Sequence, residues 1–411
     1  MEDKGSFEMK RLLFVCGVFY PEPVVSARMQ TDLARELARK YQVTVLRPRP
    51  TRPNGFSFPN YDYASLPFDV IEIDSYTCPA SSLTGRLRES VSHGRWCARY
   101  VRHHHKEIDF IYNDSWHLFG VWLVAKTAVK YGIPYVTPVQ DVYPEALTSK
   151  LPLFGRKLVM NLLSPLDHFS LSHAQFVHTN SDMLADYLAT TRGMDRRQFV
   201  AVRNWQDESS FVKYYEEADT EIVKHHEVFT FMYLGNVGPL AGIEVLFDAF
   251  SQANLPQARL VIAGSGPSKD HLRQIAEKYS CRIEFWDVPM GMVAETQGRA
   301  DVMMLPMLKG TAQYSVPSKL PAYLFSAKPV IASVDADSDT AHCVRESGAG
   351  WLAEPEDVPT ITQVMCVAFK TSDENRRKMG ACGREYAMRN FTKEKNLSVL
   401  SQAIEAILSD K

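Results

Sequence analysis

Short apolar runs alternate with amphipathic segments along most of this chain, and this alternation constrains the fold more than any other feature. Residues 11–16 (RLLFVC) form the first apolar run, and a turn rich in Gly and Pro follows them. Met29, Leu33 and Leu37 then recur at four-residue intervals, and residues 42–46 (QVTVL) form the next apolar run. Such spacing predicts a strand, an amphipathic helix that starts at about Ser26, and a second strand. Because the connecting helix lets both strands run in the same direction, a parallel βαβ unit is expected.

The same alternation occurs in two separate series. In the first, we expect further strands at 70–73, 109–112 and 134–138 and helices at 86–106 and 117–130. The second begins at 229–235 and contains expected strands near 259–264, 283–286, 301–306 and 329–333. The intervening segment, residues 203–227, is charged and lacks clear periodicity, which is typical of an interdomain connection. The fold class predicted is α/β, with two Rossmann-like doubly wound domains facing each other across a cleft and a boundary near Asp207.

Composition excludes several other classes of protein. A formal net charge of -2 over 411 residues gives no reason to expect a nucleic-acid partner. The 7 cysteines are widely separated and form no C-x-x-C pair, so neither a disulfide framework nor a zinc site is predicted. No apolar run reaches the roughly 20 residues that span a bilayer. The first twenty residues include acidic side chains and lead directly into the first predicted strand, so we expect no signal peptide and a cytoplasmic location.

Glycine-rich turns follow two strands of the second series. Gly235, Gly238 and Gly242 lead into a helix, and residues 263–267 (AGSGP) include Gly264 and Gly266. Backbone N–H groups at such turns can bind phosphate oxygens, so the turns are candidates for holding a diphosphate. The alternative is that the glycines only permit tight packing of strand against helix.

A basic residue lies at the start of another predicted helix. Pro317 and Ser318 open this helix and Lys319 occupies its first turn, where the helix dipole disfavours a cation. An anion nearby would favour the lysine, so Lys319 is a candidate phosphate ligand. The alternative is an ordinary solvated lysine.

Polar residues also follow two strands of the first series. They are Asp114, His117, Gln140, Asp141 and Glu145. At the carboxyl ends of strands they could hydrogen-bond sugar hydroxyl groups. The alternative for His117 and Glu145 is a polar helix start, whereas Asp141 ends an apolar strand, where burial without a partner is costly.

Taken in order along the chain, several segments resemble the family-four retaining glycosyltransferases with the GT-B fold, in particular the branch found in O-antigen, capsule and colanic-acid assembly. The resemblance covers nearly the whole chain and is carried by the Gly17 loop with FYPEP, QDVYPE, YLGNVG, AGSGP, RADVMMLP, PSKLPAYLFSAKPVIA and ESGAGWLAEPED.

This resemblance implies an acceptor-binding domain at 1–206, a nucleotide-sugar-binding domain at 207–390, and a last helix at 391–411 that crosses back to the first domain. It implies transfer with retention, a nucleotide-diphosphate sugar as donor substrate, and no cofactor or metal. The acceptor is a glycan, expected to be lipid-linked, in cell-surface polysaccharide biosynthesis. The residues implied to bind the donor are Gly235, Asn236, Gly238, Gly264, Gly266, Tyr314, Ser318 and Lys319. Those implied to bind the acceptor are Gly17, Tyr20 and Glu145, and those implied in catalysis are Lys319, Asp114, His117 and Asp141.

The chain departs from the family pattern at three places. Asn236 and Ala241 stand where an Arg and a Lys commonly hold the diphosphate, which leaves that work to Lys319 and the backbone. Tyr314 and Ala322 stand where the family has a pair of glutamates. The histidine often found after the fourth strand is replaced by Asp114, with His117 nearby.

Physically, metal-free transfer requires stabilisation of the charge on the departing diphosphate, for which a lysine is suited. The segment DAD at residues 335–337 is interpreted as a polar turn and not as a metal site.

Two other functions fit the same pattern. A nucleotide-sugar epimerase would share the architecture and the diphosphate chemistry, and a degenerate, non-catalytic transferase subunit would explain the missing glutamates.

The predicted helix at 86–106 also carries a further prediction. Its arginines Arg88, Arg95, Arg99 and Arg102 fall at helical spacings among apolar residues, so we expect a peripheral contact with anionic lipid at the inner face of the cell membrane. An ordinary helix with its aromatic side chains packed inward is the alternative.

Overall fold

The chain forms two compact units. The computed structural model describes residues 9–52, 57–58, 61–78, 82–116, 118–140, 142–145, 152–205, 207–218, 228–239, 241–310 and 316–409. Unit 1 comprises Met1–Val202 together with Leu397–Lys411, and unit 2 comprises Arg203–Asn396. The sequence pattern placed the two divisions at residues 206 and 391.

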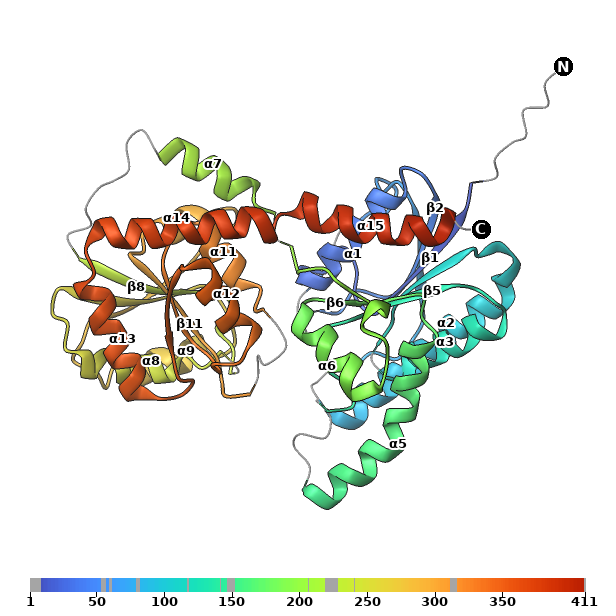
Figure 1. The fold of residues 1–411 in the computed structure, drawn as a ribbon, viewed down its shortest axis with the longest axis horizontal. Coiled ribbons are helices and arrows are strands. Elements are labelled where there is room, and N and C mark those ends of the chain that lie inside the picture. Colours follow the sequence, from blue (N-terminus) through green and yellow to red (C-terminus); the bar gives the residue numbers. More distant parts are fainter. Residues whose placement is uncertain are drawn as a thin grey trace. The chain divides into compact units, whose positions relative to one another are not determined.

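Unit 1 is built on a seven-stranded parallel sheet with the strand order β3-β2-β1-β4-β5-β6-β7 (Figure 1). The strands are β1 (Arg11–Cys16), β2 (Gln42–Pro48), β3 (Asp69–Ile73), β4 (Phe110–Asp114), β5 (Tyr135–Val139), β6 (Val177–Thr179) and β7 (Phe199–Ala201). The central strands are almost completely buried because helices cover both faces of the sheet. In the register of β1 with β4, Cys16 lies opposite Asp114 at the carboxyl end of both strands.

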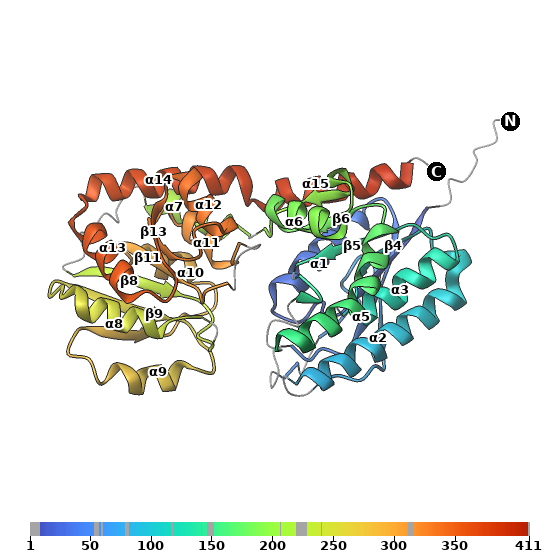
Figure 2. The ribbon, with the colours of Figure 1, turned by 60° about the horizontal axis from the view of Figure 1, so that its bottom comes forward.

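The helices of unit 1 form two layers. They are α1 (Val25–Leu37), α2 (Leu83–His104), α3 (Phe119–Lys130), α5 (Leu153–Ser172), α6 (Asp182–Arg192) and the short 3-10 helices η1 (His105–Glu107) and η2 (Arg196–Gln198). Right-handed crossovers place α2, α3 and α5 on one face of the sheet and α1 on the other (Figure 2). The last helix, α15 (Lys393–Ser409), belongs to unit 1 from Leu397 onward. Its apolar stripe, Leu397, Leu400, Ile404 and Leu408, is buried.

Unit 2 contains a six-stranded parallel sheet with the order β10-β9-β8-β11-β12-β13. The strands are β8 (Phe229–Leu234), β9 (Ala258–Ala263), β10 (Ile283–Trp286), β11 (Val302–Pro306), β12 (Val330–Ser333) and β13 (Gly350–Ala353). The helices are α7 (Ser209–Ala218), α8 (Glu244–Ala253), α9 (Lys269–Ala276), α10 (Val293–Gly298), α11 (Lys319–Phe325), α12 (Asp339–Ser347), α13 (Val358–Lys370) and α14 (Asp373–Asn390).

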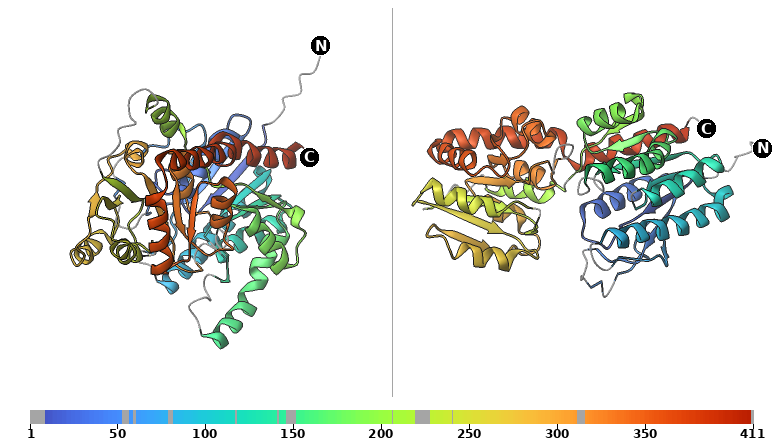
Figure 3. Two further views of the ribbon diagram at one scale, coloured as in Figure 1. Left: turned by 60° about the vertical axis from the view of Figure 1, so that its left-hand side comes forward. Right: turned by 90° about the horizontal axis from the view of Figure 1, so that it is seen from below.

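Successive side chains of β8 and its neighbours point to opposite faces of the sheet. They therefore belong to two hydrophobic cores, one on each face. Phe231 and Tyr233 pack under α8 and α13, whereas Met232 and Leu234 pack under α10, α11, α12 and α14. The sheet therefore lies between two helix layers, as Figure 3 also shows.

The two doubly wound parallel sheets predicted from the sequence are confirmed. Several local features differ from the prediction. The four-residue edge strand β13 was not predicted. Helix α1 begins at Val25 without a side-chain cap, so Ser26 lies inside its first turn. The segment at 203–227 is not featureless, since it contains α7, whose Phe211 is buried in the core of unit 2. The strands β6 and β7 were not predicted, because three residues are too few to show a period.

Candidate functional site

Strand order reverses once in each sheet, and ligands of doubly wound folds bind outside the carboxyl ends of the strands at such a point. In unit 1 the reversal lies between β1 and β4, and in unit 2 between β8 and β11. Gly17 and Asp114 lie at the first of these positions, and Gly235 lies at the second. The topology therefore selects residues that the sequence had already indicated.

Lys319 lies directly over Gly235. A Cβ atom built on Gly235 would be 2.4 Å from Cε of Lys319, so the lysine side chain would have to shift if residue 235 were larger than glycine. The Nζ atom of Lys319 is 5.5 Å from the centroid of the Tyr233 ring. Burial lowers the pKa of this lysine from its usual range. Within the part of the chain that the structure describes, no carboxylate pairs with Lys319.

Two tyrosines fix the backbone beneath Lys319. The hydroxyl of Tyr233 donates to the carbonyl oxygen of Asn236 at 2.6 Å. The hydroxyl of Tyr323 donates to the carbonyl oxygen of Leu234 at 2.7 Å and accepts from the N–H of the same residue at 3.0 Å. The end of β8 is thus held in place by buried side chains that the sequence reasoning did not single out.

The glycines after β9 allow two backbone segments to meet. Gly264 has φ +120°, and a Cβ there would lie 2.2 Å from the carbonyl oxygen of Gly235. A Cβ on Gly266 would lie 2.3 Å from the carbonyl oxygen of Val237. The Val237 N–H donates to the carbonyl of Ser265 at 2.9 Å. For Gly264 and Gly266 the close approach of backbone alone explains why glycine is needed.

The structure gives less information on the other residues predicted to bind the donor. Asn236 points its Nδ2 atom toward Gly238, 3.2 Å from where a Cβ would stand. Ser318 is exposed and its side chain caps no backbone N–H. Ala322, which replaces a family glutamate, is buried in the core of unit 2. Tyr314 lies outside the described residues.

In unit 1, a buried ion pair organises the loop that follows Gly17. Arg47 is fully buried, and its Nη2 atom lies 3.0 Å from Oε2 of Glu22. The same guanidinium donates to the carbonyl oxygen of Phe19 at 3.0 Å and to that of Tyr20. Glu22 in turn accepts from the N–H of Phe19 at 3.0 Å. In the sequence this pair is marked only by an arginine at the end of the apolar run of β2, and its importance was not predicted.

Asp114 ends β4 beside this loop, and burial raises the pKa of its carboxyl group to about 7. Nε2 of Gln30, from α1, donates to Oδ2 of Asp114, and the Gln30 side chain is only 4% exposed. The carbonyl oxygen of Asp114 accepts from the N–H of Gly17 at 2.9 Å, and the Trp116 ring covers Gly17. An acid of this pKa can either donate or accept a proton near neutral pH.

Glu145 is engaged in an ion pair. Its two carboxylate oxygens accept from Arg192 at 2.6 and 2.8 Å, and the Tyr187 hydroxyl donates to it at 3.3 Å. Burial opposes ionisation of Glu145, but the hydrogen bonds from Arg192 prevail and lower its pKa. Arg192 also donates to Asp167 at 2.8 Å and to the Tyr143 carbonyl at 2.8 Å. In this structure the observed contacts of Glu145 anchor a loop, and the predicted acceptor role stays a prediction.

Two further predicted site residues, His117 and Asp141, lie outside the described residues. Among the residues that are described, no group of three or more His, Cys, Asp or Glu side chains could hold a metal ion. No helix in the described ranges is long and apolar enough to cross a membrane.

Comparisons with known proteins agree along the two units. Residues 26–205 match the family described as "Glycosyl transferase 4-like domain", and residues 228–370 match "Glycosyl transferases group 1". The probable glycosyltransferase WbjE of Pseudomonas aeruginosa is 24% identical over 285 residues, which cover 68% of this chain and 70% of WbjE. The putative colanic acid biosynthesis glycosyl transferase WcaI of Escherichia coli (strain K12) is 23% identical over 299 residues, which cover 70% of each chain.

Solved structures show the same fold. Anabaena HepE, crystallised with UDP and glucose, has a TM-score of 0.63 at 16% identity, and the match covers 98% of this chain and 100% of HepE. Sucrose-phosphate synthase from Thermosynechococcus elongatus has a TM-score of 0.70 at 14% identity, with the same coverage of 98% and 100%.

Proposed function

Because the chain belongs to the family-four glycosyltransferases with the GT-B fold, we propose that it moves a sugar from a nucleotide-diphosphate sugar to a glycan acceptor. Transfer occurs with retention at the anomeric carbon and without a metal. The acceptor is lipid-linked, and the reaction belongs to cell-surface polysaccharide biosynthesis, at the cytoplasmic face of the membrane. The name of WcaI, a putative colanic acid biosynthesis glycosyl transferase, supports the pathway class.

The observation that carries the proposal is the position of Lys319 over Gly235 at the strand-order reversal of unit 2. Departure of a nucleoside diphosphate places negative charge on its phosphate oxygens, and a preorganised cation in a partly desolvated site stabilises that charge more than water does. Lys319 is half-buried, has no described carboxylate partner, and rests on a rigid backbone. In the proposal it binds the diphosphate together with the N–H groups of Asn236 and Gly238, because the N–H groups of Gly235 and Val237 already donate to the carbonyl oxygens of Ala263 and Ser265.

Asp114 has a separate role in the proposal. At the reversal point of unit 1 its carboxyl group contacts a hydroxyl of a bound sugar, with Gln30 fixing its orientation. Because its pKa is about 7, the acid can donate to that hydroxyl when protonated and accept from it when ionised. The catalytic roles predicted for His117 and Asp141 remain part of the proposal.

Uridine diphosphate sugars are the first donors to test. HepE, which shares the fold, was crystallised with UDP and with UDP-glucose. A thermal-shift panel of nucleoside diphosphates ranks the bases, since a ligand that binds the native state stabilises it by mass action.

The decisive experiment incubates the purified protein with labelled nucleotide sugars, with and without a lipid extract that contains glycan acceptors. Appearance of label in the lipid fraction, with release of nucleoside diphosphate, supports the proposal, and the anomeric configuration of the product tests retention. A new nucleotide sugar formed without acceptor would make the protein an epimerase instead. Failure to bind any nucleoside diphosphate would favour the non-catalytic subunit.

A further inference from the structure

The helices α2, α3 and α5 cover one face of the sheet in unit 1 and share an unusual charge distribution. Their sequences contain two acidic residues, Glu89 and Asp167. Both are neutralised internally, because Glu89 lies 2.7 Å from Arg52 and Asp167 lies 2.8 Å from Arg192. All other Asp, Glu, Lys and Arg residues on these helices are basic, namely Arg86, Arg88, Arg95, Arg99, Arg102, Lys126, Lys130, Arg156 and Lys157. A chain with a net charge of -2 thus has one strongly cationic helix layer.

The arginines of α2 are exposed and available. Within the described residues, Arg88, Arg95 and Arg99 have no carboxylate partner. Two of them rest on aromatic rings instead, with the guanidinium carbon of Arg88 4.2 Å from the Tyr76 ring centroid and that of Arg99 5.4 Å from the Trp96 ring centroid. Stacking on a ring keeps an arginine extended along the surface while leaving its N–H groups free for an anion.

The same layer exposes large apolar side chains. Leu87 is 46% and Trp96 40% exposed on α2, and Val129 is exposed on α3. Leu158 is 64% and Leu162 71% exposed, one turn apart on α5. Exposed leucine and tryptophan beside arginine is the composition of a surface that lies at a membrane interface, because the apolar groups enter the acyl boundary while the cations meet phosphates.

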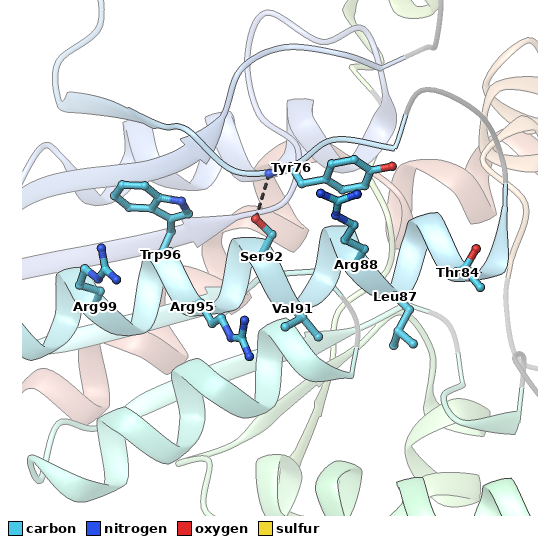
Figure 4. Close-up of a pocket in the computed structure, with 9 residues that line it drawn as sticks. All are labelled: Tyr76, Thr84, Leu87, Arg88, Val91, Ser92, Arg95, Trp96 and Arg99. Atoms are coloured by element: carbon cyan, nitrogen blue, oxygen red, sulfur yellow. Dashed lines mark hydrogen bonds between the residues drawn. The ribbon is translucent and has the colours of Figure 1, made fainter.

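An open groove of about 590 Å³ runs along α2. Figure 4 shows Leu87, Val91 and Arg95 following one another at four-residue intervals on one side of the helix. Tyr76 and Trp96 lie on the other side, and the Tyr76 N–H donates to the Ser92 hydroxyl at 2.9 Å. The groove is therefore lined by both apolar and cationic side chains, which suits an amphiphile with an acidic headgroup.

We propose that the outer surface of α2, α3 and α5 docks onto anionic phospholipid bilayers, with the α2 groove taking the headgroup phosphate of a lipid. This inference rests on the proposed function, since the lipid-linked acceptor brings the enzyme to a membrane. Each basic residue near an anionic bilayer strengthens binding by about five-fold, and the apolar side chains add burial in the acyl boundary.

The test is co-sedimentation of the full chain with vesicles. Vesicles of phosphatidylcholine mixed with phosphatidylglycerol should pellet the protein, whereas pure phosphatidylcholine vesicles should not. Replacing two groove arginines (Arg95→Gln with Arg99→Gln) should weaken binding by roughly thirty-fold. Replacing Leu87 and Leu158 by Ser should also weaken binding, although the charge is unchanged.

A matched control removes the same charge elsewhere in unit 1. Arg39 and Arg197 are exposed but already paired with Glu36 and Asp195, so Arg39→Gln with Arg197→Gln should leave binding nearly unchanged. Equal loss in the control and groove variants would reduce the effect to net charge and overturn the proposal, as would equal binding to neutral vesicles. Release by inorganic phosphate beyond that caused by sodium chloride of equal ionic strength would assign the groove to free phosphate instead.

UDP binding, measured by thermal shift without vesicles, distinguishes failure of the docking proposal from failure of the proposed function. All the variants should bind the nucleotide like the unaltered protein, because none of the altered residues belongs to unit 2. Loss of vesicle binding with nucleotide binding retained tests the docking surface alone, whereas absence of nucleotide binding in every form would count against the proposed function only.

Discussion

The side chain of Lys319 passes over Gly235 so closely that a β-carbon at residue 235 would stand 2.4 Å from Cε of the lysine and would force the lysine to shift. A glycine at the end of β8 thereby sets the position of the only site lysine predicted from the sequence.

Gly235→Ala should displace the lysine. We expect kcat to fall by about ten-fold or more, because the cation moves away from the developing charge, while the backbone remains folded. Steady-state kinetics together with a melting curve check this. Gly155→Ala, at a helical position with open space around it, is the control and should keep full activity. A Gly235→Ala enzyme with unaltered kcat would show that the position of Lys319 does not matter.

Lys319→Ala should lower kcat by about ten- to a thousand-fold, as expected for loss of one charge-stabilising donor. Stability should change little or rise slightly, since burial already disfavours the charged lysine. Kinetics and urea denaturation on the same preparation separate the two effects. Activity close to that of the unaltered protein would remove Lys319 from the site.

Asp114 makes stability depend on pH. Its pKa is raised by burial to about 7, so the native state holds a proton that the unfolded state releases near its ordinary value of 3.8. The stability associated with this proton is fully present below the unfolded pKa and is lost as the pH rises through the folded pKa. Between pH 5 and pH 8, the unfolding free energy should fall by roughly 2.5 kcal/mol more in the unaltered protein than in Asp114→Asn. Parallel pH profiles for the two proteins would contradict this assignment.

Arg192 neutralises two carboxylates at once, and Arg192→Met should destabilise unit 1 by about 3 kcal/mol because Glu145 and Asp167 lose their shared partner. The loss should be larger at pH 8 than at pH 5, since the unpaired acids can protonate at the lower pH. Denaturation at both values measures it. The exposed pair Arg197–Asp195 provides the contrast, because Arg197→Met should change the unfolding free energy far less than Arg192→Met.

Chelation should leave transfer intact. In the proposed mechanism Lys319, and not a metal ion, stabilises the negative charge on the diphosphate. Treatment with EDTA followed by dialysis is therefore expected to change kcat by less than about two-fold. Loss of activity that manganese or magnesium restores would require a cation at the diphosphate and would overturn this part of the proposal.

The sequence predicted the two sheets well because their central strands are buried on both faces and stand out as apolar runs, as in β8 and β11. The strands β6 and β7 escaped prediction because each has three residues. Helix α7 was missed within a charged segment, since only its buried Phe211 marks it clearly.

Site residues were predicted only where the residues immediately around them in the sequence form a recognisable pattern. Lys319 and Gly235 were both selected from their own turns, but their contact joins segments far apart in the chain. The partners Gln30 and Asp114 are separated by 84 residues, and no local pattern links a helix glutamine to a strand-end acid. Glu145 was judged from its place after a strand, and its ion pair with Arg192, 47 residues onward, was not visible from that place.

The residues of α15 that complete unit 1 follow the whole of unit 2 along the chain. A ribosome therefore finishes unit 2 before it adds the buried stripe of Leu400 and Ile404 to unit 1. During synthesis the face of unit 1 that packs against this stripe therefore stays uncovered until unit 2 has been made. Unit 1 is the first unit to be synthesised but the last to be completed.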